Sequence, residues 1–143
     1  MKRIYSYLLI VAIGMIGLTS CSSDDNPPDY LLGKWTLFTI SMKIYVYDEV
    51  ATEIVDEPVG GSMIMQFDFK ADNTVDYYFN NIEEETYEAT GTYHRNGNDL
   101  TIIIDDEPQT FVILRNDADN LHLGMTEEEE YVKVESELKF IRM

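Results

Sequence analysis

The chain has 143 residues, a formal net charge of −17 and a single cysteine. This length fits one domain with a packed core, and the absence of a second cysteine excludes a disulfide framework. A surface this acidic repels phosphate groups, so nucleic acid is excluded as a partner. The charge indicates a well-solvated exterior and implies neither a metal nor a cofactor.

The first residues have the pattern of an export signal. Lys2 and Arg3 precede the apolar run Leu8–Leu18, which is too short for a comfortable membrane span. The run ends in Leu18-Thr19-Ser20-Cys21, which resembles the lipobox of bacterial lipoproteins. The resemblance implies that residues 1–20 are a signal peptide and that Cys21 carries acyl chains such as palmitate, which anchor the protein to a membrane. A permanent N-terminal anchor helix is the alternative.

Residues 21–30 form a polar, proline-containing stretch with little to bury, so we expect the lipidated cysteine to be followed by a flexible tether. In such lipoproteins Ser22, rather than an aspartate, is associated with the outer membrane. The pair Asp24-Asp25 resembles a signal for export to the cell surface. The predicted location is therefore the outer membrane, with the outward-facing leaflet as a further expectation.

From Leu31 onward the hydrophobic period is two, which indicates half-buried strands. We expect eight strands, at about 34–47, 63–70, 75–79, 87–94, 100–104, 111–113, 121–125 and 132–140. Asn96-Gly97 between two of them predicts a type I′ hairpin. Short connections favour an all-β, eight-stranded up-and-down meander that closes as a barrel, with a β-sandwich as the alternative. The one long connection, about Asp48–Gly61, predicts a lid or a disordered loop, and Glu49–Val55 could form a turn or two of helix.

Short motifs give the chain a family resemblance. Gly33-Lys34-Trp35 resembles the opening signature of lipocalins, and the stretches 67–75 and 90–93 are similar to recurring blocks of small exported lipocalin-like proteins. The resemblance covers residues 31–143 and implies a lipocalin-like barrel. It also implies that Trp35 closes one end of the barrel and that Arg142 covers it. Lipocalins hold a small apolar molecule inside the barrel, and the same role is the expectation here.

The expected barrel interior is rich in methionine and aromatic residues, which suit an adaptable pocket and also a filled core. The residues expected to contact a ligand are Met42, Met63, Met65, Phe67, Phe69, Tyr77, Phe79, Tyr87, Tyr93 and Phe140, and Phe38 and Ile40 are expected to face inward with them. A small hydrophobic ligand is therefore the first hypothesis. The alternative is a filled barrel that serves as a surface module for a protein or glycan partner.

The first strand changes phase, because Trp35 and Leu37 are odd-numbered whereas Ile40 and Met42 are even-numbered. A β-bulge near Leu37 would place both pairs on the inner face.

Metal and enzyme interpretations find little support. Asp117–Asn120 lacks the glycine and the distal glutamate of a calcium loop, and the run Glu127–Glu130 cannot gather its carboxylates in an extended strand. His94 and His122 have no partner at ligand spacing, so we expect surface residues. The sequence has neither a Gly-x-Ser-x-Gly turn nor a glycine-rich phosphate loop, and a non-enzymatic monomer is the expectation.

Overall fold

A computed structural model describes residues 29–61, 63–82 and 86–143. The predicted signal peptide, Cys21 and most of the tether lie outside these residues. The strands are β1 (Gly33–Val46), β2 (Glu49–Pro58), β3 (Met63–Phe69), β4 (Thr74–Asn81), β5 (Tyr87–Asn96), β6 (Asp99–Ile104), β7 (Glu107–Asn116), β8 (Asn120–Glu129) and β9 (Val132–Arg142). The described part of the chain contains no helix, and so none long and apolar enough to cross a membrane.

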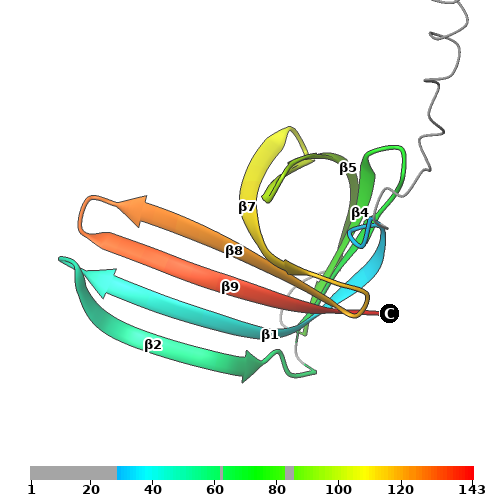
Figure 1. The fold of residues 1–143 in the computed structure, drawn as a ribbon. Helices are drawn as coiled ribbons and strands as arrows, with labels where there is room; N and C mark the ends of the chain where they lie inside the picture. The colour runs from blue at the N-terminus through cyan, green and yellow to red at the C-terminus, as the bar shows by residue number, and fades with distance from the viewer. Residues whose placement is uncertain (1–28, 62, 83–85) are drawn as a thin grey trace, which may run out of the picture.

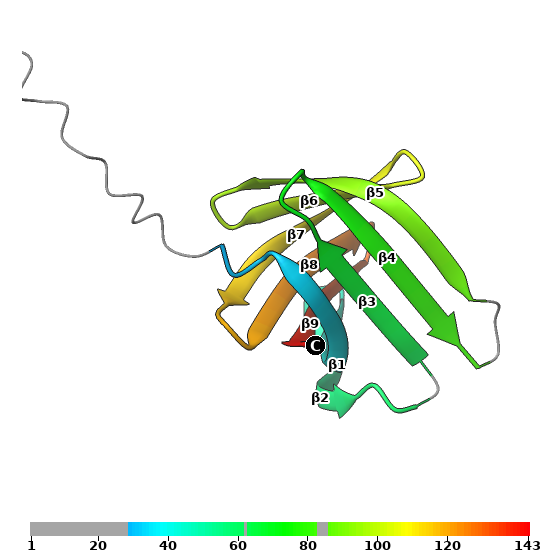
Figure 2. The same cartoon turned by 90° about the vertical axis from the view of Figure 1, so that its right-hand side faces the viewer.

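Eight of the strands form a closed circuit. Strands β3 to β9 pair antiparallel with their neighbours in chain order, and β1 pairs with both β3 and β9 (Figures 1 and 2). The predicted eight-stranded up-and-down barrel is therefore confirmed. Every strand and every buried side chain that the structure describes lies between Leu31 and Met143, so a chain that begins at Ser22 contains all of them.

Strand β2 is a ninth strand outside this circuit. It runs antiparallel to the second half of β1, from Glu49 opposite Val46 to Pro58 opposite Thr39. The expected lid, loop or helical turn between Asp48 and Gly61 is therefore wrong. The connection before β2 is a tight turn, in which Tyr47 and Asp48 both have positive φ. The length of β1 explains why β2 forms. Strand β1 extends beyond its pairing with β3, so its second half has an unpaired edge, and β2 covers that edge.

The barrel is closed at one end and open at the other. Strands β1 and β3 pair only over Gly33–Thr36, and β7 and β8 pair only from Val112 to Asn116. Beyond these pairs the sheet divides into two parts, which Figure 1 shows clearly. We call the flat part made of β8, β9, β1 and β2 the arm, and the curved part made of β3 to β7 the cup.

The predicted bulge in β1 is confirmed. The register between β1 and β9 shifts between Leu37 and Thr39, so Phe38 is an extra residue opposite the regular ladder. Trp35 and Leu37 are buried on the inner face, and Ile40 packs against the same core. Phe38 is 56% exposed, so its expected inward orientation is wrong. Phe38 faces outward as the neighbour of the inward-facing Leu37, and the bulge shifts the alternation after it so that Ile40 faces inward.

The closed end holds a packed core. Its fully or nearly buried side chains are Leu31, Trp35, Leu37, Phe67, Phe69, Val75, Tyr93, Leu100, Ile102, Phe111, Ile113, Leu121, Leu123 and Phe140. The rings of Phe69 and Tyr93 meet edge to face at 5.1 Å, and those of Phe67 and Phe140 lie 5.6 Å apart. The Tyr93 hydroxyl donates a hydrogen bond to the Lys70 carbonyl at 2.8 Å. The interior is therefore filled at this end.

The predicted hairpin between β5 and β6 forms with a different turn. Asn96 pairs with Asp99, so the central residues are Gly97 and Asn98, and of these only Gly97 has positive φ. This is the φ pattern of a type II′ turn, in which glycine takes the first central position. The turn is thus displaced by one residue from the expected Asn-Gly.

Candidate ligand-binding site

The open end of the barrel contains a cavity of about 690 Å³ between the arm and the cup. Its walls are mostly apolar side chains from the eight strands of the barrel. The lining residues are Ile40, Met42, Met65, Phe67, Tyr77, Tyr87, Ile102, Ile104, Asp105, Glu107, Gln109, Phe111, Met125, Glu127, Val134, Ser136 and Leu138. A concave, apolar space with a few polar groups at its edge is the usual form of a small-molecule site.

Aromatic rings form the wall on the cup side. The rings of Phe67 and Tyr77, which are opposite each other on β3 and β4, lie 5.2 Å apart. Tyr87 on β5 meets Tyr77 edge to face at 5.9 Å. Burial raises the pKa of the Tyr77 hydroxyl, because a phenolate is poorly solvated there. The period of two in these strands places all three rings on the inner face.

Aliphatic and methionine side chains form the wall on the arm side. Met42 on β1 and Met125 on β8 both pair with Ser136, which lies on the β9 strand between them. Ile40 pairs with Leu138 one step nearer the closed end. Unbranched methionines adapt to ligands of different shape, which suits a wall of this kind.

The mouth of the cavity is acidic. Asp105 lies in the tight turn between β6 and β7, Glu107 begins β7, and Glu127 lies on β8 of the arm. The Tyr87 hydroxyl donates a hydrogen bond to the Asp105 carboxylate, and this bond raises the pKa of Tyr87. All three carboxylates belong to exposed residues.

Trp35 and Arg142 form a plug at the closed end. Trp35 is fully buried, and the Arg142 guanidinium carbon lies 4.2 Å from the centre of its ring. The indole Nε1 donates to the Leu31 carbonyl at 2.8 Å. Arg142 donates three further hydrogen bonds, to the carbonyls of Tyr30, Leu32 and Ala118, at 2.5 to 2.8 Å. These contacts place the start of the described chain beside the closed end.

The residues expected to contact a ligand fall into three groups. Met42, Met65, Phe67, Tyr77 and Tyr87 line the cavity. Phe69, Tyr93 and Phe140 lie in the packed core at the closed end and do not line it. Met63 packs against the core, and Phe79 stacks on Tyr77 with ring centres 6.5 Å apart.

Sequence reasoning missed much of the lining. It omitted the side chains from β6 to β9, which are Ile102, Ile104, Gln109, Phe111, Met125, Val134, Ser136 and Leu138, and the mouth carboxylates Asp105, Glu107 and Glu127. Alternation within these strands could have placed most of them on the inner face. The same alternation places Glu107 with Gln109 and Glu127 with Met125, whereas no local signal could have placed Asp105, which lies in the turn between β6 and β7.

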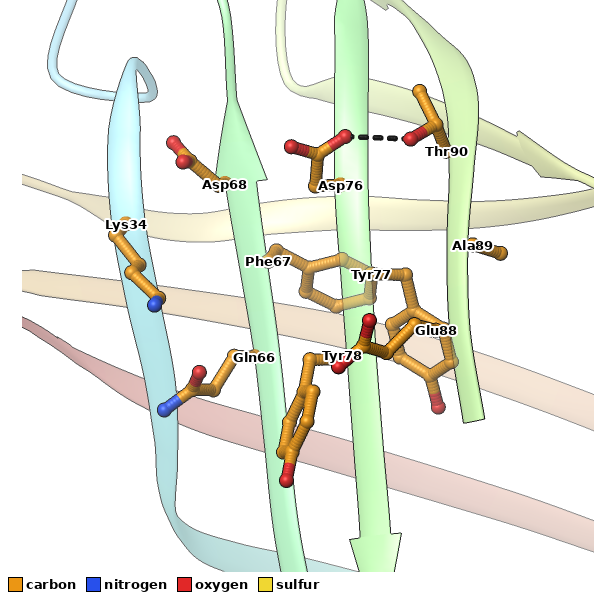
Figure 3. Close-up of a pocket in the computed structure, with 10 residues that line it drawn as sticks. All are labelled: Lys34, Gln66, Phe67, Asp68, Asp76, Tyr77, Tyr78, Glu88, Ala89 and Thr90. Atoms are coloured by element: carbon orange, nitrogen blue, oxygen red, sulfur yellow. Dashed lines mark hydrogen bonds between the residues drawn. The ribbon is translucent and has the colours of Figure 1, made fainter. Parts of the chain in front are cut away.

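A second hollow of about 680 Å³ lies on the outer face of β1, β3, β4 and β5 (Figure 3). Some of its polar side chains bond to neighbouring side chains on the same face of the sheet. Asp76 accepts a hydrogen bond from Thr90 at 2.7 Å and pairs with Lys70 at 2.6 Å, which lowers the pKa of Asp76. Gln66 donates to Thr36 at 3.1 Å. These contacts describe an ordinary polar strand surface.

The acidic turn at Asp117–Asn120 has a structural role. One carboxylate oxygen of Asp117 accepts hydrogen bonds from the backbone N–H groups of Asp119 and Asn120 and from the Asn120 side chain, and Arg115 donates to the other. These bonds hold the pKa of Asp117 well below its usual range.

Among the described residues, neither histidine belongs to a metal site. His94 is exposed, and His122 lies 3.0 Å from Glu137. Within residues 29–61, 63–82 and 86–143, no group of three potential ligands could hold a metal ion.

The fold is that of small up-and-down β-barrels, in which eight strands enclose either a filled core or a single small-molecule cavity. A family model for the lipocalin-like domain matches residues 31–123. The chain therefore belongs to the lipocalin-like domain family.

Two solved structures share this fold. A lipocalin-like protein from Bacteroides uniformis is 18% identical with a TM-score of 0.50, and the match covers 80% of this chain and 99% of that one. Lobster apocrustacyanin A1 is 14% identical with a TM-score of 0.50, over 82% of this chain and 63% of that one. At these identities the likeness shows the fold alone. A comparison with curated proteins found no match.

Proposed function

We propose that this protein is a lipid-anchored binding protein that holds a small hydrophobic molecule in the cavity between the cup and the arm. The observation that carries the proposal is the cavity itself, whose volume of about 690 Å³ falls within the usual range for small-molecule sites. The cavity favours this function over a filled surface module, because only the Trp35 end of the interior is packed.

The sequence supports a lipid anchor on Cys21 and a location at the outer membrane, with the Asp24-Asp25 pair favouring the outward-facing leaflet. The geometry fits such an anchor. Leu31 is fully buried beside Trp35, so the chain reaches the barrel at its closed end. A tether attached there leaves the cavity mouth free to face away from the membrane.

We propose binding without catalysis. The cavity walls offer apolar contact area, and the carboxylates stand at the exposed mouth rather than in a water-excluded cleft. General acid–base chemistry between carboxylates needs pairs whose pKa values are separated by their surroundings. Belonging to the lipocalin-like domain family supports the same conclusion.

The experiment uses residues Ser22–Met143 and a neutral naphthylamine dye that fluoresces in apolar surroundings. Native mass spectrometry of the purified protein, followed by organic extraction, identifies any molecule that remains bound. Met65 lines the cavity, so Met65→Trp should weaken dye binding by about tenfold or more. Ile64 is the matched control, because it lies next to Met65 on β3 but is 40% exposed and does not line the cavity.

Equal dye affinity for the wild-type protein, Met65→Trp and Ile64→Trp would contradict binding in this cavity. Failure of the wild-type protein to bind the dye or to retain any small molecule would contradict the proposed function as a whole.

A further inference from the structure

The charges around the cavity are of one sign. Among the described residues that line it, the side chains that carry a charge at neutral pH are Asp105, Glu107 and Glu127. In the proposed function this cavity holds the ligand, so the charge at its mouth acts on any bound molecule. They flank the mouth from both sides, two on the cup and one on the arm.

The aromatic wall lies on the same cup side as two of these carboxylates. The Tyr87 hydroxyl bonds to Asp105, so the Tyr87 ring lies close to the mouth. Tyr77 contacts Tyr87 edge to face, and Phe67 follows toward the closed end. The faces of such rings attract cations, and tyrosine is among the better rings for this contact.

These two features, an acidic mouth and an aromatic wall, favour the same ligand chemistry. A ligand with one apolar end would place that end against Met42, Met65 and Leu138, and its polar end would lie at the mouth. An ammonium group there is attracted by the carboxylates and by the rings, whereas a carboxylate is repelled by the three negative charges.

We propose that the cavity selects apolar molecules that carry a protonated amine or a quaternary ammonium group, and that it discriminates against apolar acids. This inference rests on the proposed function, because it names the ligand class of the same cavity. It identifies the mouth carboxylates as residues that determine specificity.

The test compares three ligands with the same chain length, namely decylamine, decanol and decanoate, each below the concentration at which it forms micelles. Each displaces the neutral naphthylamine dye from Ser22–Met143 at neutral pH. Decylamine should reach half-displacement at a concentration at least about tenfold lower than decanoate, with decanol between them.

Two triple variants separate the mouth from the general negative charge of the protein. In the first, Asp105→Asn, Glu107→Gln and Glu127→Gln remove the mouth charges, and the amine and the acid should then displace the dye at similar concentrations. Asparagine suits position 105, because Asp105 has a φ of 52° and asparagine tolerates that backbone. The matched control carries Asp68→Asn, Glu88→Gln and Asp99→Asn, which change three acids outside the cavity. This control should keep the wild-type preference.

Salt gives a test that needs no variant. Raising the salt concentration from about 50 mM to about 500 mM should reduce the preference of the wild-type protein for the amine, because the mouth charges are exposed to solvent.

The outcomes distinguish the two proposals. If decanol displaces the dye but decylamine has no advantage over decanoate, the inference is wrong and the proposed function stands. An equal loss of preference in both triple variants also overturns the inference, because the effect then comes from overall charge. If the dye does not bind at all, the proposed function itself fails.

Discussion

Arg142 is expected to be the surface cation that contributes most to stability, and Arg142→Met tests this expectation. The side chain lies over the ring of the buried Trp35 and donates hydrogen bonds to the carbonyls of Tyr30, Leu32 and Ala118. It therefore joins the segment just before β1, the turn between β7 and β8, and strand β9. Methionine keeps most of the apolar contact and removes the charge and the donors.

The structure sets the size of the expected effect. A guanidinium over an indole ring contributes about 0.5 to 2 kcal/mol, depending on its exposure. Hydrogen bonds to a charged donor contribute about 1.5 to 3 kcal/mol when buried, and two of the three here are exposed and weaker. We expect Arg142→Met to lower the free energy of unfolding by about 3 kcal/mol. Arg142→Lys keeps the charge but loses the planar guanidinium, and it should lower the free energy of unfolding by about half as much.

The assay is urea denaturation of Ser22–Met143, followed by far-ultraviolet circular dichroism and by the fluorescence of Trp35, the single tryptophan of the chain. Arg115→Met is the matched control. Its salt bridge to Asp117 is exposed, so its loss should change the free energy of unfolding by less than about 1 kcal/mol. The reasoning would be refuted if Arg142→Met and Arg115→Met had the same small effect.

Two further predictions concern alkaline pH and the anchor. Burial raises the pKa of Tyr77 in the folded protein, so its contribution to stability is complete below the unfolded pKa of about 10 and is lost as the pH rises through the folded value. Tyr77→Phe should therefore reduce the fall in stability between about pH 9 and pH 11, as measured by urea denaturation, and an unchanged slope would contradict this linkage. Cys21→Ser in the full chain should abolish incorporation of a labelled fatty acid and release the protein from the membrane fraction. Continued incorporation of the fatty acid into Cys21→Ser would show that the lipid is attached to another residue.

Much of the fold could be predicted because strand alternation is a local signal. The sequence pattern predicts the apolar face of β9, from Val132 to Phe140, and the hairpin around Gly97. Strand β2 was missed for a physical reason. Its pairing with β1 has two register shifts, and it carries four acidic residues along an exposed strand, so the period of two is lost.

The candidate site could be predicted only in part. Alternation shows which face a residue lies on, but it does not show how far along the barrel the residue lies. Phe67 and Phe69 share the inner face of β3, yet only Phe67 reaches the cavity. The boundary between packed core and cavity depends on where β1 leaves β3 and where β7 leaves β8, and both are contacts between segments distant in sequence.

The position of β9 affects when the domain can fold. Strand β9 lies between β8 and β1, and its pairing with β1 extends from Val132 opposite Val46 to Arg142 opposite Trp35. The barrel therefore cannot close before β9 is made, and closure then joins segments that lie far apart in the sequence, which is a slow step in folding. For a protein that is exported as we propose, slow closure of the barrel would favour transport of the chain before it folds.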